Sequence, residues 1–313
     1  MPRAIAFAAY GGPEHLGIID VPSRGPAPDE VVITVRASGL NPVDLKLGSG
    51  YRGDDPARLP LRIGFEAAGF VAAVGSDGLT GADGAPIAVG DEVLAFRVPG
   101  AHARELTVPA RDVLQKPAEL SFEQAAGLLL AAATAEDALQ TVRLAAGETV
   151  LVHGVAGSVG RATAQLARHR GARVVGTAAA HRHEELRALG VEPVRYGDGL
   201  LVRLEPLGPY AAAVDTIGTA EAGETSVALV ADPTRIVTIT GSPAILAAGG
   251  TAIGGGNPRS DAVRDAARAE LLRLAAAGEL DLPVVAARPF DDFRAAFALL
   301  AEGHAGGKIV LVP

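Results

Sequence analysis

A glycine-rich turn between an expected strand and an expected helix constrains this fold more than any other feature. Apolar residues 149–152 precede the turn, and residues 157–169 follow it with apolar side chains at helical spacing. The turn reads His153-Gly154-Val155-Ala156-Gly157-Ser158-Val159-Gly160. Glycines remove side chains that block a pyrophosphate from backbone amides and a helix N-terminus. The turn therefore predicts a dinucleotide-binding βαβ unit, although a turn that only packs tightly is the alternative interpretation.

The fit to the dinucleotide fingerprint is incomplete at one position. Gly157 and Gly160 stand where its second and third glycines belong, whereas Val155 occupies the place of the first. The strand before the turn and the helix after it still favour phosphate binding over simple packing.

The rest of the chain predicts an α/β protein of two domains, which its 313 residues also favour. Short strand-like runs separated by Gly and Pro predict a barrel-like antiparallel domain; they cover residues 4–9, 30–35, 68–74, 92–96 and 105–108. From about residue 121 helices and strands alternate, which predicts a doubly wound parallel sheet. We expect one domain from residues 1–120 and 256–313, and a nucleotide-binding domain from residues 121–255.

Composition excludes several classes of function. The chain has no cysteine, which excludes disulfides, thiolate metal sites and thiol nucleophiles. A net charge of −8, without a basic run interleaved with aromatic residues, makes nucleic acid a poor partner. No signal-peptide pattern and no apolar stretch of membrane length is present, so we expect a cytoplasmic protein.

The end of the second expected strand of the nucleotide-binding domain indicates which coenzyme fits. NAD-binding folds place an acidic residue about 20 residues after the glycine turn to hold the ribose hydroxyls. Here no acid precedes Glu184, while Arg182 and His183 carry donors for a 2′-phosphate. The pattern predicts NADPH rather than NADH. The alternative is that both residues only begin a solvated helix.

Several motifs, in this order, resemble the zinc-independent quinone oxidoreductases of the medium-chain dehydrogenase/reductase family, the zeta-crystallin-like proteins. Besides the glycine turn they are Gly39-Leu40-Asn41-Pro42-Val43-Asp44, Gly64-Phe65-Glu66-Ala67-Ala68-Gly69, Val89-Gly90-Asp91-Glu92-Val93 and Gly307-Lys308-Ile309-Val310-Leu311. The resemblance implies a GroES-like β-barrel catalytic domain built from both ends of the chain and a Rossmann domain between them. It also implies a cleft where nicotinamide meets substrate, and a homodimer formed through the Rossmann domain.

The resemblance also shows which metal ligands are missing. Zinc-dependent relatives carry Cys where this chain has Asn41, His where it has Phe65, and a second Cys near Ala131, so that only Glu66 is kept. A relay Ser or Thr is replaced by Val43. Oxidation of simple alcohols loses its chemical support without a Lewis acid and a relay. We therefore expect no metal, and hydride transfer from NADPH to a quinone or an activated α,β-unsaturated carbonyl.

Two residues are catalytic candidates. Asn41 offers an amide N–H to an oxygen that gains negative charge, or it caps a turn before Pro42. Tyr51 stands where family members often place an aromatic residue over the substrate; its phenol hydrogen-bonds a carbonyl, donates a proton, or only packs.

Further residues are expected to bind the coenzyme. The turn contributes Gly154, Ala156, Gly157, Ser158, Val159 and Gly160. Other expected contacts, several of them by resemblance, are Thr134, Thr177, Arg182, His183, Tyr196, Gly241, Ser242 and Lys308. For Lys308 a solvated position at the start of an edge strand is the favoured interpretation. Isolated histidines are expected on the surface or in packing roles, namely His15, His102, His153, His169 and His304.

Two other functions fit the same residues. One is a biosynthetic enoyl reductase or tailoring enzyme acting on a polyketide-like enone. The other is an NADPH-binding sensor without catalysis, favoured by the lack of an assured acid.

Overall fold

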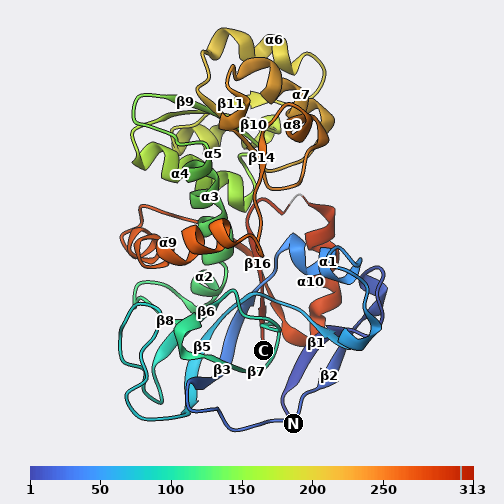
Figure 1. The fold of residues 1–313 in the computed structure, drawn as a ribbon, viewed down its shortest axis with the longest axis vertical. Helices are drawn as coiled ribbons and strands as arrows, with labels where there is room; N and C mark the ends of the chain where they lie inside the picture. Colours follow the sequence, from blue (N-terminus) through green and yellow to red (C-terminus); the bar gives the residue numbers. More distant parts are fainter. Residues whose placement is uncertain (304) are drawn as a thin grey trace. The chain divides into compact units, whose positions relative to one another are not determined.

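The computed structural model describes residues 1–303 and 305–313, and His304 lies outside the described residues. The chain forms two compact units (Figure 1). The first unit comprises Met1–Leu130 and Leu282–Pro313, and the second comprises Ala131–Asp281. Each unit is described by itself.

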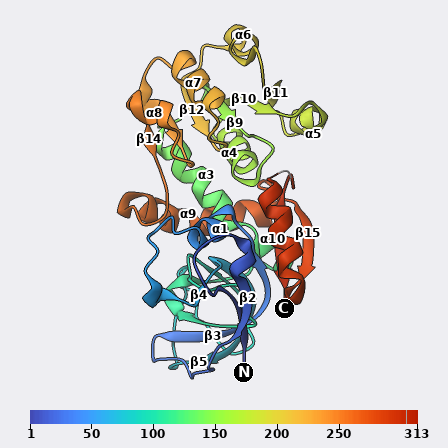
Figure 2. The ribbon, with the colours of Figure 1, turned by 90° about the vertical axis from the view of Figure 1, so that its right-hand side faces the viewer.

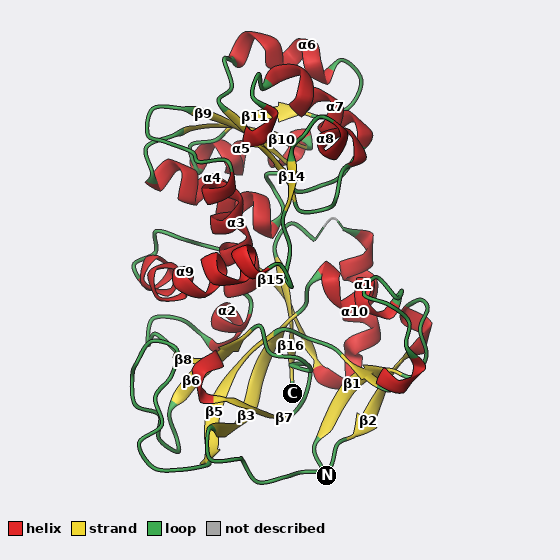
Figure 3. Ribbon diagram, in the orientation of Figure 1, coloured by secondary structure: helices red, strands yellow, loops and turns green. Residues whose placement is uncertain are grey.

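The first unit is built on a mainly antiparallel sheet, with the order β15-β16-β3-β5-β6-β8 and β7 paired to β3 (Figure 3). Within it, β15 and β16 run parallel to each other. Its strands are β3 (Glu30–Gly39), β5 (Glu66–Val74), β6 (Glu92–Phe96), β7 (Glu105–Pro109), β8 (Val113–Gln115), β15 (Val284–Pro289) and β16 (Lys308–Val312). A smaller sheet, β2-β1-β4, comprises β1 (Arg3–Phe7), β2 (Leu16–Asp20) and β4 (Leu61–Arg62). The barrel-like antiparallel domain expected from the strand spacing is confirmed.

Both ends of the chain contribute to the core of this unit. Ile5 and Phe7 from the N-terminal strand pack against Phe290, Phe297 and residues of β16, because alternate side chains of each strand face the same side. The helices of the unit are α1 (Pro42–Gly48), α2 (Phe122–Ala126) and α10 (Phe293–Glu302). The C-terminal tail therefore completes the first unit, as its motif suggested.

The second unit is a six-stranded parallel sheet of order β11-β10-β9-β12-β13-β14. Its strands are β9 (Thr149–His153), β10 (Arg173–Ala178), β11 (Glu192–Arg195), β12 (Ala212–Asp215), β13 (Ile236–Thr238) and β14 (Thr251–Ala252). The chain runs outward from β9 to β11 and then returns to the other side of β9. The strand order therefore reverses between β9 and β12, which is where ligands bind in open α/β sheets.

Helices connect successive strands of the sheet, and one further helix precedes β9 and another follows β14. They are α3 (Leu129–Thr141), α4 (Ser158–His169), α5 (His183–Ala188), α6 (Leu200–Leu204), α7 (Ala220–Leu229), α8 (Pro243–Ala247) and α9 (Pro258–Ala276), with the short 3-10 helix η4 (Ala180–Arg182) before α5. Figure 2 shows α5 beside β11 and α8 beside β14, at opposite ends of the sheet. This arrangement confirms the Rossmann-like domain.

One face of the parallel sheet carries an apolar row that α6 and α8 cover. Val175, Leu151, Ala213 and Ile236 are neighbours in register across four strands, so their side chains point to the same face. They form one buried cluster with residues that include Leu200, Leu204 and Ile245. Among the described residues, no helix is both long and apolar enough to cross a membrane.

The division into units differs from the one we expected at both boundaries. Residues 121–130, which include α2, group with the first unit. Residues 256–281, which include α9, group with the second unit rather than the first. The physical reason lies in buried polar contacts, since Arg264 of α9 donates to the buried Asp137 of α3, with 3.2 Å between Nε and Oδ2. Arg259 also donates to Thr141 of α3 at 2.8 Å. Hydrophobic periodicity does not reveal such pairs.

Candidate functional site

The glycine turn follows β9 at the reversal of strand order, and close backbone contacts dictate its residues. Gly154 has φ +73°, a conformation that L side chains rarely adopt, and a Cβ there would lie 2.8 Å from Thr216 Oγ1. A Cβ on Gly160 would lie 2.3 Å from the carbonyl oxygen of Gly154. Only glycine at these two positions lets α4 begin so close to the strand.

The mismatch at Val155 has a local explanation. Its side chain is fully buried and fills the space above Gly176 of β10, where an added Cβ would lie 2.6 Å from Val155 Cγ1. Its backbone amide donates to Thr177 O at 3.1 Å. The conformational freedom of the missing first glycine is supplied by Gly154 instead. Val155 therefore joins the turn to the neighbouring strand.

The N-terminus of α4 offers donors for an anion. Gly157 is its N-cap residue, and Ser158 and Val159 begin the helix. The first-turn amides of an α-helix have no intrahelical acceptor, and the helix dipole favours negative charge there. Ala156, Ser158 and Val159 are partly exposed, so this end of the helix suits a pyrophosphate.

A row of polar side chains crosses the sheet just beyond the apolar row. Thr177, His153, Asp215 and Thr238 are in register on β10, β9, β12 and β13, and all four are buried. Each lies two residues closer to the carboxyl end of its strand than its counterpart in the apolar row, and therefore on the same face. The row lies directly beneath the region where ligands bind in this type of sheet.

Asp215 organises the loops after β12 and β13. One carboxylate oxygen accepts from the amides of Ile217 and Gly218, at 3.0 and 2.8 Å, and the other accepts from the hydroxyls of Thr238 and Thr240. This carboxylate holds together two loops that border the switch point.

The two loop residues expected after β13 are held by the same network. The amides of Gly241 and Ser242 donate to Thr238 Oγ1, at 3.2 and 3.3 Å. Ser242 is buried as the N-cap residue of α8. Both residues therefore lie at the carboxyl end of the sheet, where they were expected.

The end of β10 holds the expected 2′-phosphate residues. Arg182 ends η4, and its guanidinium donates through Nε and Nη2 to Glu185 Oε1, the Nε distance being 2.8 Å. His183 begins α5, with its Nε2 3.4 Å from the carbonyl oxygen of Ala178. Tyr196, just after β11, is 48% exposed. These positions border the same end of the sheet, and Glu185 adds a carboxylate that our expectation omitted.

In the first unit, Asn41 and Lys308 belong to one buried polar cluster with Glu66. Lys308 Nζ donates to Asn41 Oδ1 at 2.7 Å, to Glu66 Oε1 at 2.9 Å and to the Leu40 carbonyl at 3.2 Å. The three side chains come from β16, β5 and the N-terminus of α1, and each residue is at most 3% exposed. Lys308 is therefore buried rather than solvated, because β16 lies between β15 and β3 and is not an edge strand.

The cluster occupies the hydrogen-bonding groups of Asn41. Its Nδ2 donates to the Gly39 carbonyl at 3.1 Å and to Glu66 Oε1 at 3.0 Å, and its oxygen accepts from Lys308. An amide nitrogen has two hydrogens, so both are used within the protein. The Asn41 backbone N–H also donates to Asp44 Oδ2 at 2.8 Å, at the start of α1.

Glu66 is the one carboxylate retained from the metal-ligand pattern, and it serves as the counter-ion of Lys308. Its second oxygen accepts from the Leu130 amide at 2.8 Å. An ammonium group thus lies within hydrogen-bond distance of Asn41 and Glu66, the two residues of this cluster that the resemblance compares with metal-ligand positions. Among the described residues, no group of three or more His, Cys, Asp or Glu side chains is arranged to hold a metal ion.

The isolated histidines divide into two pairs. His15 and His169 lie at the surface beside Glu14 and Glu279. His102 is fully buried between Ser38 Oγ, at 2.9 Å, and Asp44 Oδ2, at 3.3 Å. His153 is fully buried in the polar row. Burial lowers the pKa of His153 to about 4, and the charge of Asp215 offsets part of this shift.

The remaining expected residues lie in different environments. Tyr51 is 69% exposed in the loop after α1, and Thr134 is buried in α3. Thr177 is buried too, and its hydroxyl accepts from the Gly154 amide at 3.2 Å.

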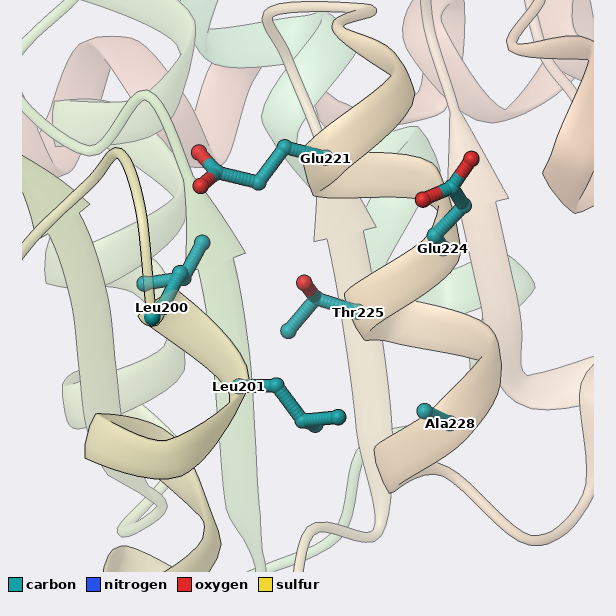
Figure 4. A pocket seen from close by; sticks show the side chains of 7 residues that line it. Leu200, Leu201, Glu221, Glu224, Thr225 and Ala228 are labelled. Atoms are coloured by element: carbon teal, nitrogen blue, oxygen red, sulfur yellow. The ribbon is translucent and has the colours of Figure 1, made fainter.

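A cavity of about 440 Å³ opens between α6 and α7. Figure 4 shows Leu200 and Leu201 facing Glu221, Glu224 and Thr225 across it. None of the site residues expected from the sequence lines this cavity.

Comparison with known proteins identifies the family of this chain. Residues 27–118 match the alcohol dehydrogenase GroES-like domain, and residues 189–311 match the zinc-binding dehydrogenase domain. The chain is 38% identical to rat quinone oxidoreductase over 187 residues and 41% identical to that of Pseudomonas aeruginosa over 180 residues. The chain belongs to the quinone oxidoreductases of the medium-chain dehydrogenase/reductase family. This membership confirms the resemblance to quinone oxidoreductases that the motifs suggested.

These matches have a limited extent. The rat and Pseudomonas alignments cover 59% and 56% of this chain, and the chain spans about half the length of the curated relatives it matches, at 55% and 53%. A rat synaptic vesicle membrane protein VAT-1 homolog is 37% identical over 199 residues, which are 62% of this chain and 48% of that protein.

Solved structures of this family match over the whole chain. Quinone oxidoreductase from Coxiella burnetii has a TM-score of 0.84 at 28% identity, covering 100% of this chain and 99% of that one. The Escherichia coli enzyme complexed with NADPH has a TM-score of 0.84 at 26% identity, covering 99% and 100%. A mycobacterial protein complexed with NADPH has a TM-score of 0.85 at 29% identity, covering both chains fully. The CurK enoyl reductase, at 24% identity and a TM-score of 0.85 over 99% of each chain, shows the shared fold alone.

Sequence reasoning missed two features of the site. It assigned no partner to Glu66 beyond a lost metal, and it treated His153 as an ordinary packing residue. A signal was present for each, since a retained acid without its metal needs another cation, and His153 directly precedes the turn. The spatial pairing with Lys308, which is 242 residues from Glu66, has no local signature.

The buried Glu66–Lys308 pair predicts a specific pattern of stability. Glu66→Gln or Lys308→Met alone leaves one buried charge without its partner and is expected to cost about 3–5 kcal/mol of unfolding free energy. The double variant carries no such charge and is expected to cost clearly less than the sum of the two. Urea unfolding of the four proteins measures this coupling. Additive losses would contradict a direct ion pair.

His153 predicts a pH dependence of stability. The folded protein keeps the imidazole neutral down to pH about 4, whereas an unfolded chain protonates it below about 6.5. Unfolding is therefore coupled to proton uptake between these values, and stability falls by up to about 3 kcal/mol as pH drops from 6.5 to 4. His153→Leu is expected to remove this component, and His181→Gln, at an exposed position, to keep it. Urea titrations at several pH values measure the free energy of unfolding of the three proteins. If it falls equally with decreasing pH in all three, the assignment is wrong.

Proposed function

We propose that the chain is an NADPH-dependent reductase that transfers hydride to a quinone or an activated α,β-unsaturated carbonyl without a metal. The observation that carries this proposal is the glycine turn at the switch point of the parallel sheet, followed at the end of β10 by Arg182 where an NAD-binding fold has an acid. The Escherichia coli and mycobacterial relatives complexed with NADPH support the same coenzyme.

The described residues fit NADPH at two places. The amides of Ala156, Ser158 and Val159 and the N-terminus of α4 suit the pyrophosphate. Arg182 and His183 suit the 2′-phosphate, because a guanidinium binds phosphate oxygens in a bidentate geometry. When bound, NADPH supplies the hydride, and the residues of this chain orient the coenzyme and exclude competing reactions.

The same residues do not fit a catalytic zinc ion. Asn41 supplies an amide instead of a thiolate, Phe65 supplies no ligand, and Glu66 is engaged by the Lys308 ammonium. These contacts support metal-free hydride transfer, although one matching domain family is described as zinc-binding. They also favour acceptors that are already electrophilic, such as quinones and enones.

The side chains of the first unit then act mainly by position. Because both Asn41 amide hydrogens are used within the protein, we propose that Asn41 shapes the site together with Lys308 and is not itself the oxyanion donor. Tyr51 has an exposed phenol and is the proposed hydrogen-bond or proton donor to the acceptor. Thr134, Tyr196, Gly241 and Ser242 stay predicted coenzyme contacts.

A biosynthetic enoyl reductase acting on a polyketide-like enone would use the same residues, and an NADPH sensor would use only those of the second unit. The cytoplasmic location and the homodimer through the Rossmann domain also stay predictions; light scattering tests the latter. The two exposed residues of β14, at the edge of the parallel sheet, suit such a contact.

NADPH consumption tests the proposed activity. Absorbance at the nicotinamide band is expected to decay when purified protein is mixed with NADPH and a panel of benzoquinones, naphthoquinones and conjugated enones, and added chelator is expected to leave the rate unchanged. The quinone and enone arms distinguish the two enzymatic interpretations. NADPH binding without oxidation by any acceptor would leave the sensor interpretation in place.

Arg182 tests the choice of coenzyme. Arg182→Ala is expected to raise the dissociation constant of NADPH about tenfold to a hundredfold, which corresponds to losing a charge-assisted hydrogen bond. Its effect on NADH, which lacks the 2′-phosphate, is expected to be less than twofold. His181→Gln, at the exposed neighbouring position, serves as the matched control in fluorescence titrations. Equal losses for NADPH and NADH would show that Arg182 does not face the phosphate.

A further inference from the structure

We infer that His153 is a positioning residue for the coenzyme-binding turn and that it acts through the hydroxyl of Thr177. The inference rests on the proposed binding of NADPH at this turn. It assigns a role to a fully buried imidazole that neither the fingerprint glycines nor the proposed hydride transfer uses.

The contacts form a chain from the imidazole to the first peptide of the turn. Thr177 Oγ1 lies 3.3 Å from His153 Nδ1 and accepts from the Gly154 amide at 3.2 Å. The Thr177 carbonyl accepts from the next amide of the turn, that of Val155, at 3.1 Å. On the other side of β9, Thr216, the residue directly after β12, donates through Oγ1 to the His153 carbonyl at 2.7 Å. The peptide between His153 and Gly154 is thus held from β10 and from the β12 side.

The arrangement specifies the tautomer of His153. A hydroxyl has one hydrogen, and the Gly154 N–H is only a donor, so Thr177 Oγ1 accepts there and can donate its own hydrogen to Nδ1. The proton of the neutral ring then resides on Nε2. Nε2 has no partner among the described residues in either tautomer. With the proton on Nδ1, the Thr177 hydroxyl hydrogen would in addition lose Nδ1 as its acceptor. The hydrogen-bond count therefore favours the Nε2–H form.

The unpaired Nε2 atom of His153 indicates a role for this residue beyond packing. His153 Nε2 is buried without a hydrogen-bond partner among the described residues, and an unpaired buried polar group destabilises a fold. Leu151, two residues earlier on the same face, shows that this face of β9 also carries a buried aliphatic side chain. An aliphatic side chain at position 153 would avoid the cost but would leave Thr177 without its acceptor.

Fixing the Thr177 hydroxyl matters because Gly154 has a conformation with little intrinsic restraint. A glycine such as Gly154, at φ +73°, can adopt many other backbone conformations. If the turn were not held in advance, coenzyme binding would have to restrict these conformations at an entropic cost. Two hydrogen bonds from β10 hold the Gly154 and Val155 amides, so the later amides at Ala156 and Ser158 are aimed before the pyrophosphate arrives. The imidazole contributes by keeping the threonine oxygen oriented toward Gly154.

The test compares His153→Leu, Thr177→Val, Thr177→Ser and the double variant His153→Leu/Thr177→Val. The dissociation constant of NADPH is expected to rise roughly three- to tenfold in each of the first two, as expected for one lost hydrogen bond. Thr177→Ser keeps the hydroxyl and should retain near wild-type affinity. The double variant should bind no worse than Thr177→Val alone, because the two residues act in series. Ser226→Ala removes another buried hydroxyl, which donates to Ala222 O within α7, and should leave the affinity unchanged.

Two measurements without coenzyme separate positioning from general stability. Hydrogen exchange at the Gly154 amide is expected to accelerate in His153→Leu and Thr177→Val, but not in Thr177→Ser or Ser226→Ala. Nitrogen-15 chemical shifts should show a protonated Nε2 and an unprotonated Nδ1 in the wild type. If His153→Leu does not fold, the Thr177→Val and Thr177→Ser pair still carries the exchange comparison, and the wild-type tautomer is read directly.

An Nδ1-protonated tautomer would overturn the inference and leave the proposed function intact. Wild-type NADPH affinity and Gly154 exchange in His153→Leu would do the same. Additive losses in the double variant would likewise show that His153 does not act through Thr177. Failure of the wild-type protein to bind NADPH would overturn both this inference and the proposed function.

Discussion

The close approach of backbone to backbone at the end of β9 is the constraint on which the second unit depends. The carbonyl oxygen of Gly154 lies where a side chain on Gly160 would begin, and Gly154 itself has a left-handed conformation. Larger residues at either position would push α4 away from the sheet. The turn, the start of α4 and the amides available to a phosphate all follow from this contact. Val155 fits because the neighbouring strand also has a glycine, Gly176, opposite its side chain.

A layer of polar side chains separates this turn from the apolar core. Thr177, His153, Asp215 and Thr238 are in register on four adjacent strands, just beyond the row that packs under α6 and α8. Buried polar groups need partners, and these find most of them in the loops at the carboxyl end of the sheet. The polar row thereby holds the loops that border the proposed coenzyme site, and it separates that site from the apolar core.

The first unit contains a buried ion pair, between Glu66 and Lys308. Its buried carboxylate, Glu66, is compensated by an ammonium group from the last strand, that of Lys308. Such a pair repays its desolvation only with good geometry and further hydrogen bonds, which Asn41, Leu40 and Leu130 provide. The arrangement joins both ends of the chain and leaves no amide hydrogen of Asn41 for a substrate.

The sequence by itself determined the fold class, the glycine turn and the strands and helices around it, because hydrophobic periodicity and glycine positions are local properties. It also placed the basic residues after β10. Only the tertiary structure decided that α9 belongs with the second unit, that Lys308 is buried against Glu66, and that His153 meets Thr177. These features depend on pairing between residues far apart in the chain, and such pairing leaves no periodic pattern in the sequence. Buried polar contacts are therefore where this structure adds most to what its sequence predicts.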